Sequence, residues 1–161
     1  KDIVTASDAI MIARGDLGIE CPMEELPIIQ RRIIKKCIQI GRPVIVATHM
    51  LESMIENPVP TRAEITDVAN AVFEEADAVM LSGETATGKY PVACVEVLDR
   101  VARRIGLSGG AGYAAEAIVD TQRKKTVLAA VKLANTLEKS SIVVFTRHGE
   151  MADTEIGRAH V

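Results

Sequence analysis

Three short apolar runs in this chain end at nearly equal intervals, and polar residues follow each of them. AIMIA (9–13), VIVAT (44–48) and AVML (78–81) have lengths typical of strands that are buried on both faces. The corresponding strand ends, Ala13, Thr48 and Ser82, are 35 and 34 residues apart. Because a helical pattern lies between successive runs, the spacing predicts consecutive βα units with parallel strands.

Each predicted helix has a recognisable start or stop signal. The first covers 26–40 and ends before Gly41, and the second begins at Thr61, where Glu64 completes a capping box. The third begins near Pro91 and continues through Ile105. The predicted buried faces are Leu26, Ile29, Ile33, Cys37 and Ile40 in the first helix, Ile65, Val68, Val72 and Phe73 in the second, and Val95, Leu98, Val101 and Ile105 in the third.

The period breaks after the third helix. GLSGGAGYAA (106–115) is typical of a flexible stretch, and we place a domain boundary there, with one domain at 1–107 and a second at 108–161. The second part is expected to contain an amphipathic helix with Val127, Val131, Ala134 and Leu137, and a strand at IVVF (142–145). A chain that starts at Lys1, close to a strand, is also expected to be a piece of a longer protein.

Composition argues against several classes of protein. Hydrophobic residues make up 48% of 161 residues, enough for a packed core without extensive disorder. The 19 basic and 22 acidic residues are scattered, which argues against a nucleic-acid surface. Cys21, Cys37 and Cys94 lack metal-ligand spacing, so we expect reduced core thiols in a cytoplasmic protein. No apolar run approaches the roughly 20 residues that span a bilayer, so no membrane partner is expected.

Polar residues at the strand ends are the candidate site, because parallel α/β folds bind ligands at the carboxyl ends of their strands. A carboxylate, hydroxyls and glycine-exposed amides at one edge suit a divalent cation and an anionic substrate. The candidates are Arg14, Gly15 and Asp16 after the first strand, Thr48 and His49 after the second, and Ser82, Gly83, Glu84 and Thr85 after the third.

Spacing alone leaves a structural alternative open. Asp16 then caps the turn that follows it, and Thr48 satisfies neighbouring backbone groups. For His49 we expect a structural hydrogen-bonding role rather than that of a base.

Two long strings carry a resemblance to a known family. DAIMIARGDLGIE and RPVIVATHMLESMIENPVPTRAEITDVANAVFEEADAVMLSGETATGKYP closely resemble pyruvate kinases over about residues 3–105, and SSIVVFTRHGE does so more faintly. The resemblance implies an α/β fold: a partial TIM (β/α)8 barrel, with barrel strands 6 to 8 and their helices, followed by the start of an α/β C-terminal domain. Such an enzyme transfers phosphoryl from phosphoenolpyruvate to ADP, giving pyruvate and ATP in glycolysis, with Mg²⁺ (or Mn²⁺) and K⁺.

The resemblance also assigns roles to individual residues. Asp16 matches a ligand of the divalent cation, and the amides around Gly15 and Asp16 match those that hold the substrate carboxylate at a short helix amino terminus. Thr48 matches a threonine that binds substrate and delivers a proton to the enolate, and Ser82 and Glu84 match its proton-relay network. Arg14 matches a residue near a subunit contact, implying a structural or assembly role, and the family implies a homo-tetramer.

The chain departs from the family in several places. The family's catalytic lysine and second metal-binding carboxylate precede the first residue here, so this chain alone is expected to be inactive. THM (48–50) stands where TQM is usual, which we expect to be tolerated. TRHGEMADTEIGRAHV (146–161) replaces a serine- and threonine-rich phosphate-holding loop, for which His148 and Glu150 are poor substitutes.

Two other functions remain open at this point. One is a metal-dependent, enolate-forming barrel lyase or aldolase, because Asp16 and Thr48 suit that chemistry. The other is a noncatalytic interaction module that is stable only when docked to other chains. In either case three βα units cannot close a barrel, so we expect an open sheet with helices on one face and a half-covered face formed by Met11, Ile45 or Val46, and Met80.

Overall fold

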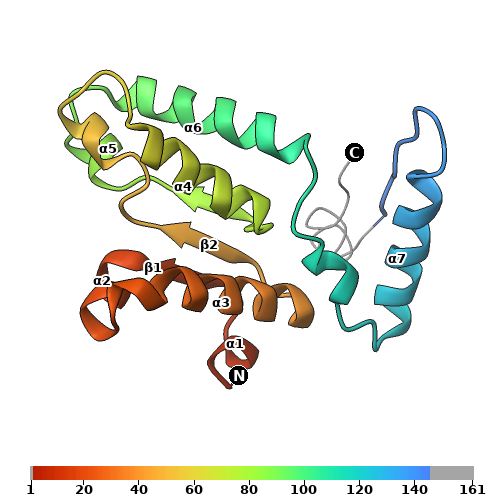
Figure 1. The fold of residues 1–161 in the computed structure, drawn as a ribbon. Coiled ribbons are helices and arrows are strands. Elements are labelled where there is room, and N and C mark those ends of the chain that lie inside the picture. Colours follow the sequence, from red (N-terminus) through yellow and green to blue (C-terminus); the bar gives the residue numbers. More distant parts are fainter. Residues whose placement is uncertain (1, 146–161) are drawn as a thin grey trace.

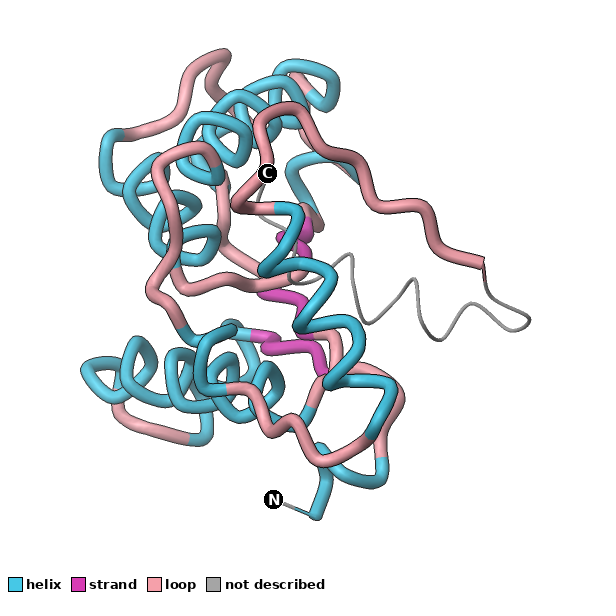
Figure 2. The backbone as a smooth tube through the Cα atoms, turned by 90° about the vertical axis from the view of Figure 1, so that its right-hand side faces the viewer, coloured by secondary structure: helices cyan, strands magenta, loops and turns pink. Residues whose placement is uncertain are grey.

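A three-stranded parallel sheet lies at the centre of the computed structural model, which describes residues 2–145 (Figures 1 and 2). The strands are β1 (Ile10–Ala13), β2 (Val44–Ala47) and β3 (Ala78–Met80). Their order is β1-β2-β3, and the register pairs Ala13 with Ala47 and Ala47 with Met80. The three predicted strands are therefore confirmed, and they end level with one another.

Helices connect and flank these strands as the predicted βα units require. The α-helices are α1 (Asp2–Ala6), α2 (Arg14–Glu20), α3 (Leu26–Ile40), α4 (Arg62–Phe73), α5 (Gly83–Ala86), α6 (Pro91–Gly106) and α7 (Gln122–Ala134). Short 3₁₀ helices are η1 (Met23–Glu25), η2 (Glu52–Ile55) and η3 (Tyr113–Glu116). Figure 1 shows α6 running along the outside of α4, and α7 standing apart from the sheet.

The first long helix, α3, begins and ends where predicted, but its buried face is rotated. Gly41 adopts a left-handed φ of 82°, and its N–H donates to the carbonyl of Cys37, which closes the helix. The buried residues are Gln30, Ile34 and Cys37, whereas the predicted Ile33 is only partly buried. Apolar periodicity excluded Gln30, yet its amide is satisfied inside the protein by Glu74 at 3.0 Å.

The buried faces predicted for α4 and α6 are confirmed in part, because Val68 is buried and Ile65, Leu98 and Val101 pack against the core. Phe73 and Val95 were predicted to be buried, but both are exposed. Ala71 on α4, with Cys94 and Val97 on α6, are buried instead. Small side chains allow two helices to approach closely, a preference that hydrophobicity alone does not reveal.

The sheet is covered by helices on one face only, as expected for an open sheet. Ile12 and Val46 pack with α3 and α4 in the core. Strand alternation places Met11 and Ile45 on the opposite face, where Met11 is 54% exposed. The expectation for Met11 is therefore confirmed, and Ile45 rather than Val46 belongs to this face.

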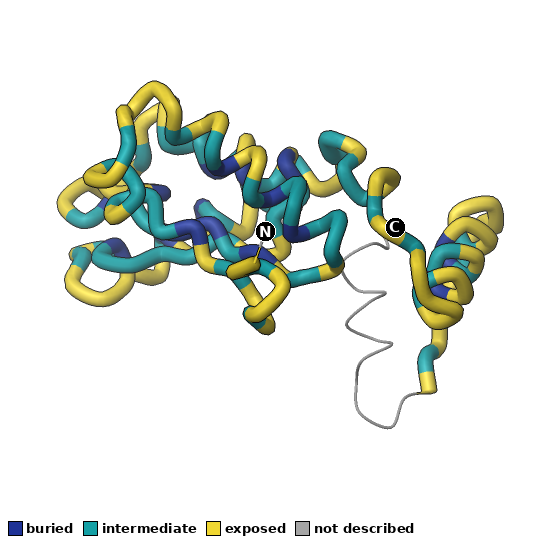
Figure 3. The backbone as a smooth tube through the Cα atoms, turned by 90° about the horizontal axis from the view of Figure 1, so that it is seen from below, coloured by how far each residue is buried: buried dark blue, intermediate teal, exposed yellow. Residues whose placement is uncertain are grey.

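The part of the chain beyond α6 agrees with prediction in its helix but not in its strand. Val127 and Val131 are buried on α7, whereas Leu137 lies beyond the helix end and is exposed. Residues 142–145 form no strand, because no described strand lies beside them to pair their backbone groups, and Phe145 is 93% exposed. In Figure 3, which colours each residue by its burial, most of the buried residues lie in the part of the chain before α7. The segment with His148 and Glu150 lies outside the described residues.

A capping box starts α4 as predicted, and it also fastens the loop before the helix. Thr61 accepts from the N–H of Glu64, whose carboxylate accepts from the Thr61 N–H at 2.7 Å. The same carboxylate accepts from the Ser53 N–H and hydroxyl at 2.7 and 2.6 Å. Burial opposes ionisation, but the four hydrogen bonds from Ser53 and Thr61 outweigh it and lower the pKa of Glu64.

Replacing Glu64 with Gln is expected to reduce the free energy of unfolding by about 1 kcal/mol at pH 7. Because the folded pKa is lowered, the unfolded chain binds more protons at acid pH, and this stabilisation is lost as pH falls below about 4.3, the ordinary glutamate value. Urea titrations of wild type and variant at pH 7 and pH 3 measure the difference. Glu24→Gln, an exposed change, is the control, and a difference that does not shrink at acid pH would contradict the assignment.

Candidate functional site

The ends of the three strands bring the predicted site residues to one edge of the sheet. Ala13, Ala47 and Met80 are paired in register, so the residues that follow them leave the sheet at the same level. Helix α2 begins directly after β1, and the short α5 begins three residues after β3. The edge is therefore formed by the start of α2, the loop after β2 and the turn into α5.

A direct contact joins the first two strand ends. The Gly15 N–H donates to the Thr48 hydroxyl oxygen at 2.8 Å, and that hydroxyl donates to the Ala47 carbonyl at 2.6 Å. A side chain at Gly15 would lie 3.2 Å from a ring carbon of His49, so the glycine permits this close approach. The Gly15 amide, expected to bind a substrate carboxylate, is used here to hold Thr48.

The loop after β2 turns through a backbone conformation that L residues rarely adopt. Thr48 and His49 have φ angles of 69° and 53°, both in the left-handed region. For a β-branched residue such as Thr48 this conformation is strained, and it persists because the surroundings hold it. Among those surroundings is the guanidinium of Arg14, which donates to the Thr48 carbonyl from Nε at 3.1 Å and from Nη2 at 2.7 Å.

Arg14 is the centre of a clip between two βα units. Its Nη1 faces both carboxylate oxygens of Asp67 on α4, at 2.7 and 2.6 Å, and its Nη2 also donates to the His49 carbonyl at 3.1 Å. The Arg14 side chain is only 12% exposed. A planar guanidinium can satisfy all these acceptors at once, which an ammonium cannot. Within this chain Arg14 therefore has a structural role. This is one of the two roles, structural or in assembly, that the family resemblance implies.

Asp16 stands apart from the other predicted site residues. It lies in the first turn of α2, is exposed, and makes no hydrogen bond or ion pair with any described residue. It lines a hollow of about 400 Å³ near the free edge of β1, together with Met11 and Leu17, but without Thr48 or Ser82. The structure therefore leaves this carboxylate free for a ligand, and does not by itself join it to Thr48.

Glu84 is buried, and its carboxylate ties the second and third strand ends together. The side chain accepts from the Leu51 N–H at 3.0 Å and from the Ser82 N–H at 2.8 Å. Burial opposes ionisation, but backbone N–H groups, including those of Leu51 and Ser82, outweigh it and lower the pKa of Glu84. The ionised Glu84 carboxylate accepts hydrogen bonds from these backbone N–H groups and so holds the strand ends in place. Because it carries no proton, it is poorly suited to act as a proton donor.

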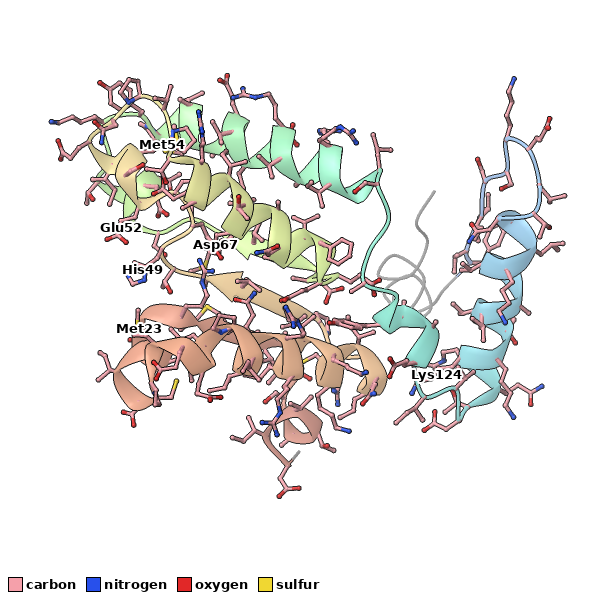
Figure 4. All side chains as sticks on the ribbon, viewed as in Figure 1. Met23, His49, Glu52, Met54, Asp67 and Lys124 are labelled. Atoms are coloured by element: carbon pink, nitrogen blue, oxygen red, sulfur yellow. The ribbon has the colours of Figure 1, made fainter. Side chains whose placement is uncertain are left out.

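A pocket of about 540 Å³ opens beside this edge, between α2, α3 and α4. Its polar lining includes Arg14, Asp67 and the buried Gln30 and Glu74 pair. His49 lies at its rim, where Nε2 is 3.4 Å from Glu52. Figure 4 places His49, Glu52 and Asp67 near one another, with Met23 across from them. Sequence reasoning missed this group because helix positions 30, 67 and 74 carry no motif of their own.

The described residues offer no preformed metal cage. Among residues 2–145, no three His, Cys, Asp or Glu side chains converge in a way that could hold a metal ion. The thiols of Cys21, Cys37 and Cys94 are free there; Cys37 and Cys94 lie in the core as predicted, whereas Cys21 is only partly buried. Burial, with Asp77 nearby, raises the pKa of Cys37 to about 11, which keeps this thiol protonated and unreactive. None of the helices described here is both long and apolar enough to cross a membrane.

Comparison with known proteins gives a consistent set of relatives. The family model described as pyruvate kinase, barrel domain, matches residues 1–95. Pyruvate kinase isozyme G, chloroplastic, of Ricinus communis is 52% identical over 153 residues, covering 93% of this chain and 36% of the relative. Pyruvate kinase of Mycobacterium intracellulare is 49% identical over 150 residues, covering 93% of this chain and 32% of the relative. The chain thus spans about a third of the length of these two relatives.

Proposed function

This chain belongs to the pyruvate kinase family, and from that premise we propose that it is part of an enzyme that transfers a phosphoryl group from phosphoenolpyruvate to ADP. The products are pyruvate and ATP, and the reaction is a step of glycolysis in the cytoplasm. The observation that carries the proposal is the shared strand edge, where the Gly15 N–H holds the Thr48 hydroxyl and the next residue, Asp16, has a carboxylate that is free among the described residues. A metal-bound anion fits that arrangement.

Within the parent protein, residues 1–107 supply strands 6 to 8 of a (β/α)8 barrel, and residues 108–161 begin the C-terminal domain. The open face of the sheet supports this placement, because Met11 and Ile45 are apolar residues that a closed barrel covers with its other strands. Both β1 and β3 are edge strands here, and in a closed barrel each of them pairs with a further strand of the parent protein. Four such subunits assemble in the proposed parent, as in the family.

Asp16 is the residue of this chain that would hold the divalent cation, Mg²⁺ or Mn²⁺. Its carboxylate is exposed and unpaired among the described residues, which fits a cation that takes one or two protein carboxylates and completes its shell with substrate and water oxygens. When bound, the cation neutralises charge on the substrate oxygens. In this proposal the remaining ligands, the catalytic lysine and the site for K⁺ lie elsewhere in the parent protein, and we expect this chain alone to be inactive.

Thr48 is the residue that faces the reacting enolate in this proposal. Its hydroxyl oxygen accepts a hydrogen bond from the Gly15 N–H. The hydroxyl hydrogen is donated to the Ala47 carbonyl and can rotate towards a bound substrate. Ser82 lies at the adjacent turn and extends the polar network at the edge. Glu84 acts through that turn and through the loop after β2, which makes it a positioning residue rather than a proton donor.

The experiment that tests the function assays the full-length parent protein for pyruvate formation from phosphoenolpyruvate and ADP. Activity that requires both substrates and a divalent cation is the expected result. Cleavage of a carbon–carbon bond in a 2-oxo acid without ADP would favour the metal-dependent lyase instead. No turnover of either kind, together with stable binding to another chain, would favour a noncatalytic interaction module.

Replacing Thr48 with Val in the parent protein is expected to lower kcat by about 10²-fold while changing KM by less than about threefold. Valine keeps the branched shape but removes the hydroxyl, and proton transfer by a positioned group contributes factors of this order. A slower exchange of the pyruvate methyl protons with solvent deuterium, followed by NMR, locates the loss at the enolate. Thr66→Val, at an exposed hydroxyl on α4, is the control, and equal effects of the two changes would show that Thr48 takes no part in the reaction.

A further inference from the structure

The segment that follows α6 folds back onto the ends of α3 and α4. We call residues 110–118 the strap. The Ala111 N–H donates to the Phe73 carbonyl at 2.7 Å, and the Ile118 N–H donates to the Gln39 carbonyl at 3.0 Å. Figure 1 shows the chain descending from the end of α6, past the end of α4, towards α3. This glycine-rich stretch, which sequence predicted to be flexible, is held at both of its ends.

Glu75 holds the middle of the strap with both carboxylate oxygens. Oε1 accepts from the Gly112 N–H at 2.6 Å, and Oε2 accepts from the Ala114 N–H at 2.9 Å. These two N–H groups lie at the start of η3, where no side chain of the segment itself caps them. The carboxylate of Glu75, two residues beyond the end of α4, therefore supplies the cap for a helix that is about 38 residues further along the chain.

Two backbone features show that the fit between Glu75 and the strap is specific. Glu75 has a φ of 64°, in the left-handed region that non-glycine residues rarely adopt. Gly110 passes so close that an added side-chain carbon would lie 2.5 Å from Glu75 Oε1 and 2.6 Å from its Cγ. The backbone of Glu75 is thus strained, and a side chain at position 110 would have to displace the Glu75 carboxylate.

The other contacts of the strap are weaker. Lys35 pairs with Glu116 at 2.8 Å and lies 5.5 Å from the centre of the Tyr113 ring, but both members of the ion pair are well exposed. Exposed ion pairs contribute little, whereas hydrogen bonds from backbone N–H groups to a half-buried carboxylate are among the stronger ones. Among the charged side chains that contact the strap, Glu75 is therefore the one on which its position depends most.

We propose that Glu75 is a latch that fastens the strap to the end of α4 and so fixes the direction in which the chain leaves towards α7. With the latch closed, residues 110–118 are a rigid connector between the sheet-containing part and the chain beyond it. With the latch open, residues 112–114 lose these hydrogen bonds and become more mobile, while the backbone hydrogen bonds of Ala111 and Ile118 and the packing of Tyr113 remain. This role does not depend on which reaction the parent protein catalyses.

The first test replaces Glu75 with Gln in the full-length parent protein and measures amide hydrogen exchange. Gln keeps the size of the side chain but presents an NH₂ group to one of the two N–H donors, so exchange in the peptide covering 108–118 is expected to speed up by at least about tenfold. Exchange in β2 is expected to stay unchanged. Glu96→Gln makes the same charge change on the exposed face of α6 and is the matched control.

The second test opens the latch from the opposite side. Gly110→Ala introduces the clash with Glu75 without altering its charge, and its φ is compatible with alanine. We expect faster exchange in the same peptide and faster chymotrypsin cleavage after Tyr113. Gly106→Ala, where an added carbon meets nothing within 4 Å, is the control. If Glu75→Gln and Gly110→Ala both leave exchange and cleavage of the strap at wild-type rates, Glu75 is not a latch.

Discussion

Asp16→Ala in the full-length parent protein is expected to lower turnover by at least about 10³-fold. A metal ion at a reacting oxygen supplies several kcal/mol of charge stabilisation, and about 1.4 kcal/mol corresponds to each factor of ten in rate. Asp16 is exposed in the first turn of α2 and bonds to no other described residue, so its removal costs the fold little. The expected loss is therefore one of chemistry rather than of stability.

Steady-state kinetics across a range of Mn²⁺ concentrations measure this effect. The Mn²⁺ concentration that gives half-maximal activity is expected to rise by more than about tenfold, because the variant lacks a carboxylate that binds the cation directly. The urea midpoint of unfolding is expected to match that of wild type. Glu24→Ala, an exposed change in η1, is the control. Normal turnover and normal metal dependence in Asp16→Ala would show that Asp16 does not bind the cation.

Glu84→Ala is expected to reduce the free energy of unfolding by about 3 kcal/mol or more. The change strips the Leu51 and Ser82 N–H groups of their acceptor in a site where Glu84 is only 2% exposed, and each unsatisfied buried donor costs about 1–3 kcal/mol. The cavity left by the side chain adds to that loss. Urea denaturation followed by circular dichroism gives the midpoint and the slope.

Acid pH provides an independent check on Glu84. Because its folded pKa is lowered, the stabilisation is present above the ordinary glutamate value and is lost as pH falls through the folded value. The stability difference between wild type and Glu84→Ala should therefore narrow at acid pH. Glu96→Ala, on the exposed face of α6, should behave like wild type at every pH. A Glu84 variant as stable as Glu96→Ala would mean that the carboxylate does not hold the edge.

Local patterns were sufficient to predict the frame of the fold. Short apolar runs fixed the three strands, and the Thr61 capping box and Gly41 fixed one end each of α4 and α3. These signals act between residues close in sequence, so they can be read without knowledge of the fold. Burial on the helices could not be read in the same way. Gln30 is buried because Glu74, 44 residues away, satisfies its amide, and no helical periodicity contains that partner.

The candidate site shows the same division. The positions of Gly15, Thr48 and Ser82 at strand ends followed from the βα spacing. Their partners did not, because the clip from Arg14 to Asp67 spans 53 residues and forms only when α4 packs against the sheet. The strand predicted at 142–145 failed for a related reason: strand propensity is local, but a strand needs a neighbour.

The left-handed turn at Thr48 and His49 matters for anyone who redesigns this protein. A procedure that optimises stability alone would place glycine or asparagine at position 48, because these residues adopt a φ of 69° with less strain. Such a sequence would lose the hydroxyl that Gly15 holds in place. Thermostabilised versions of the parent protein should therefore keep threonine at this position fixed, and seek their gains at surface positions away from the strand edge.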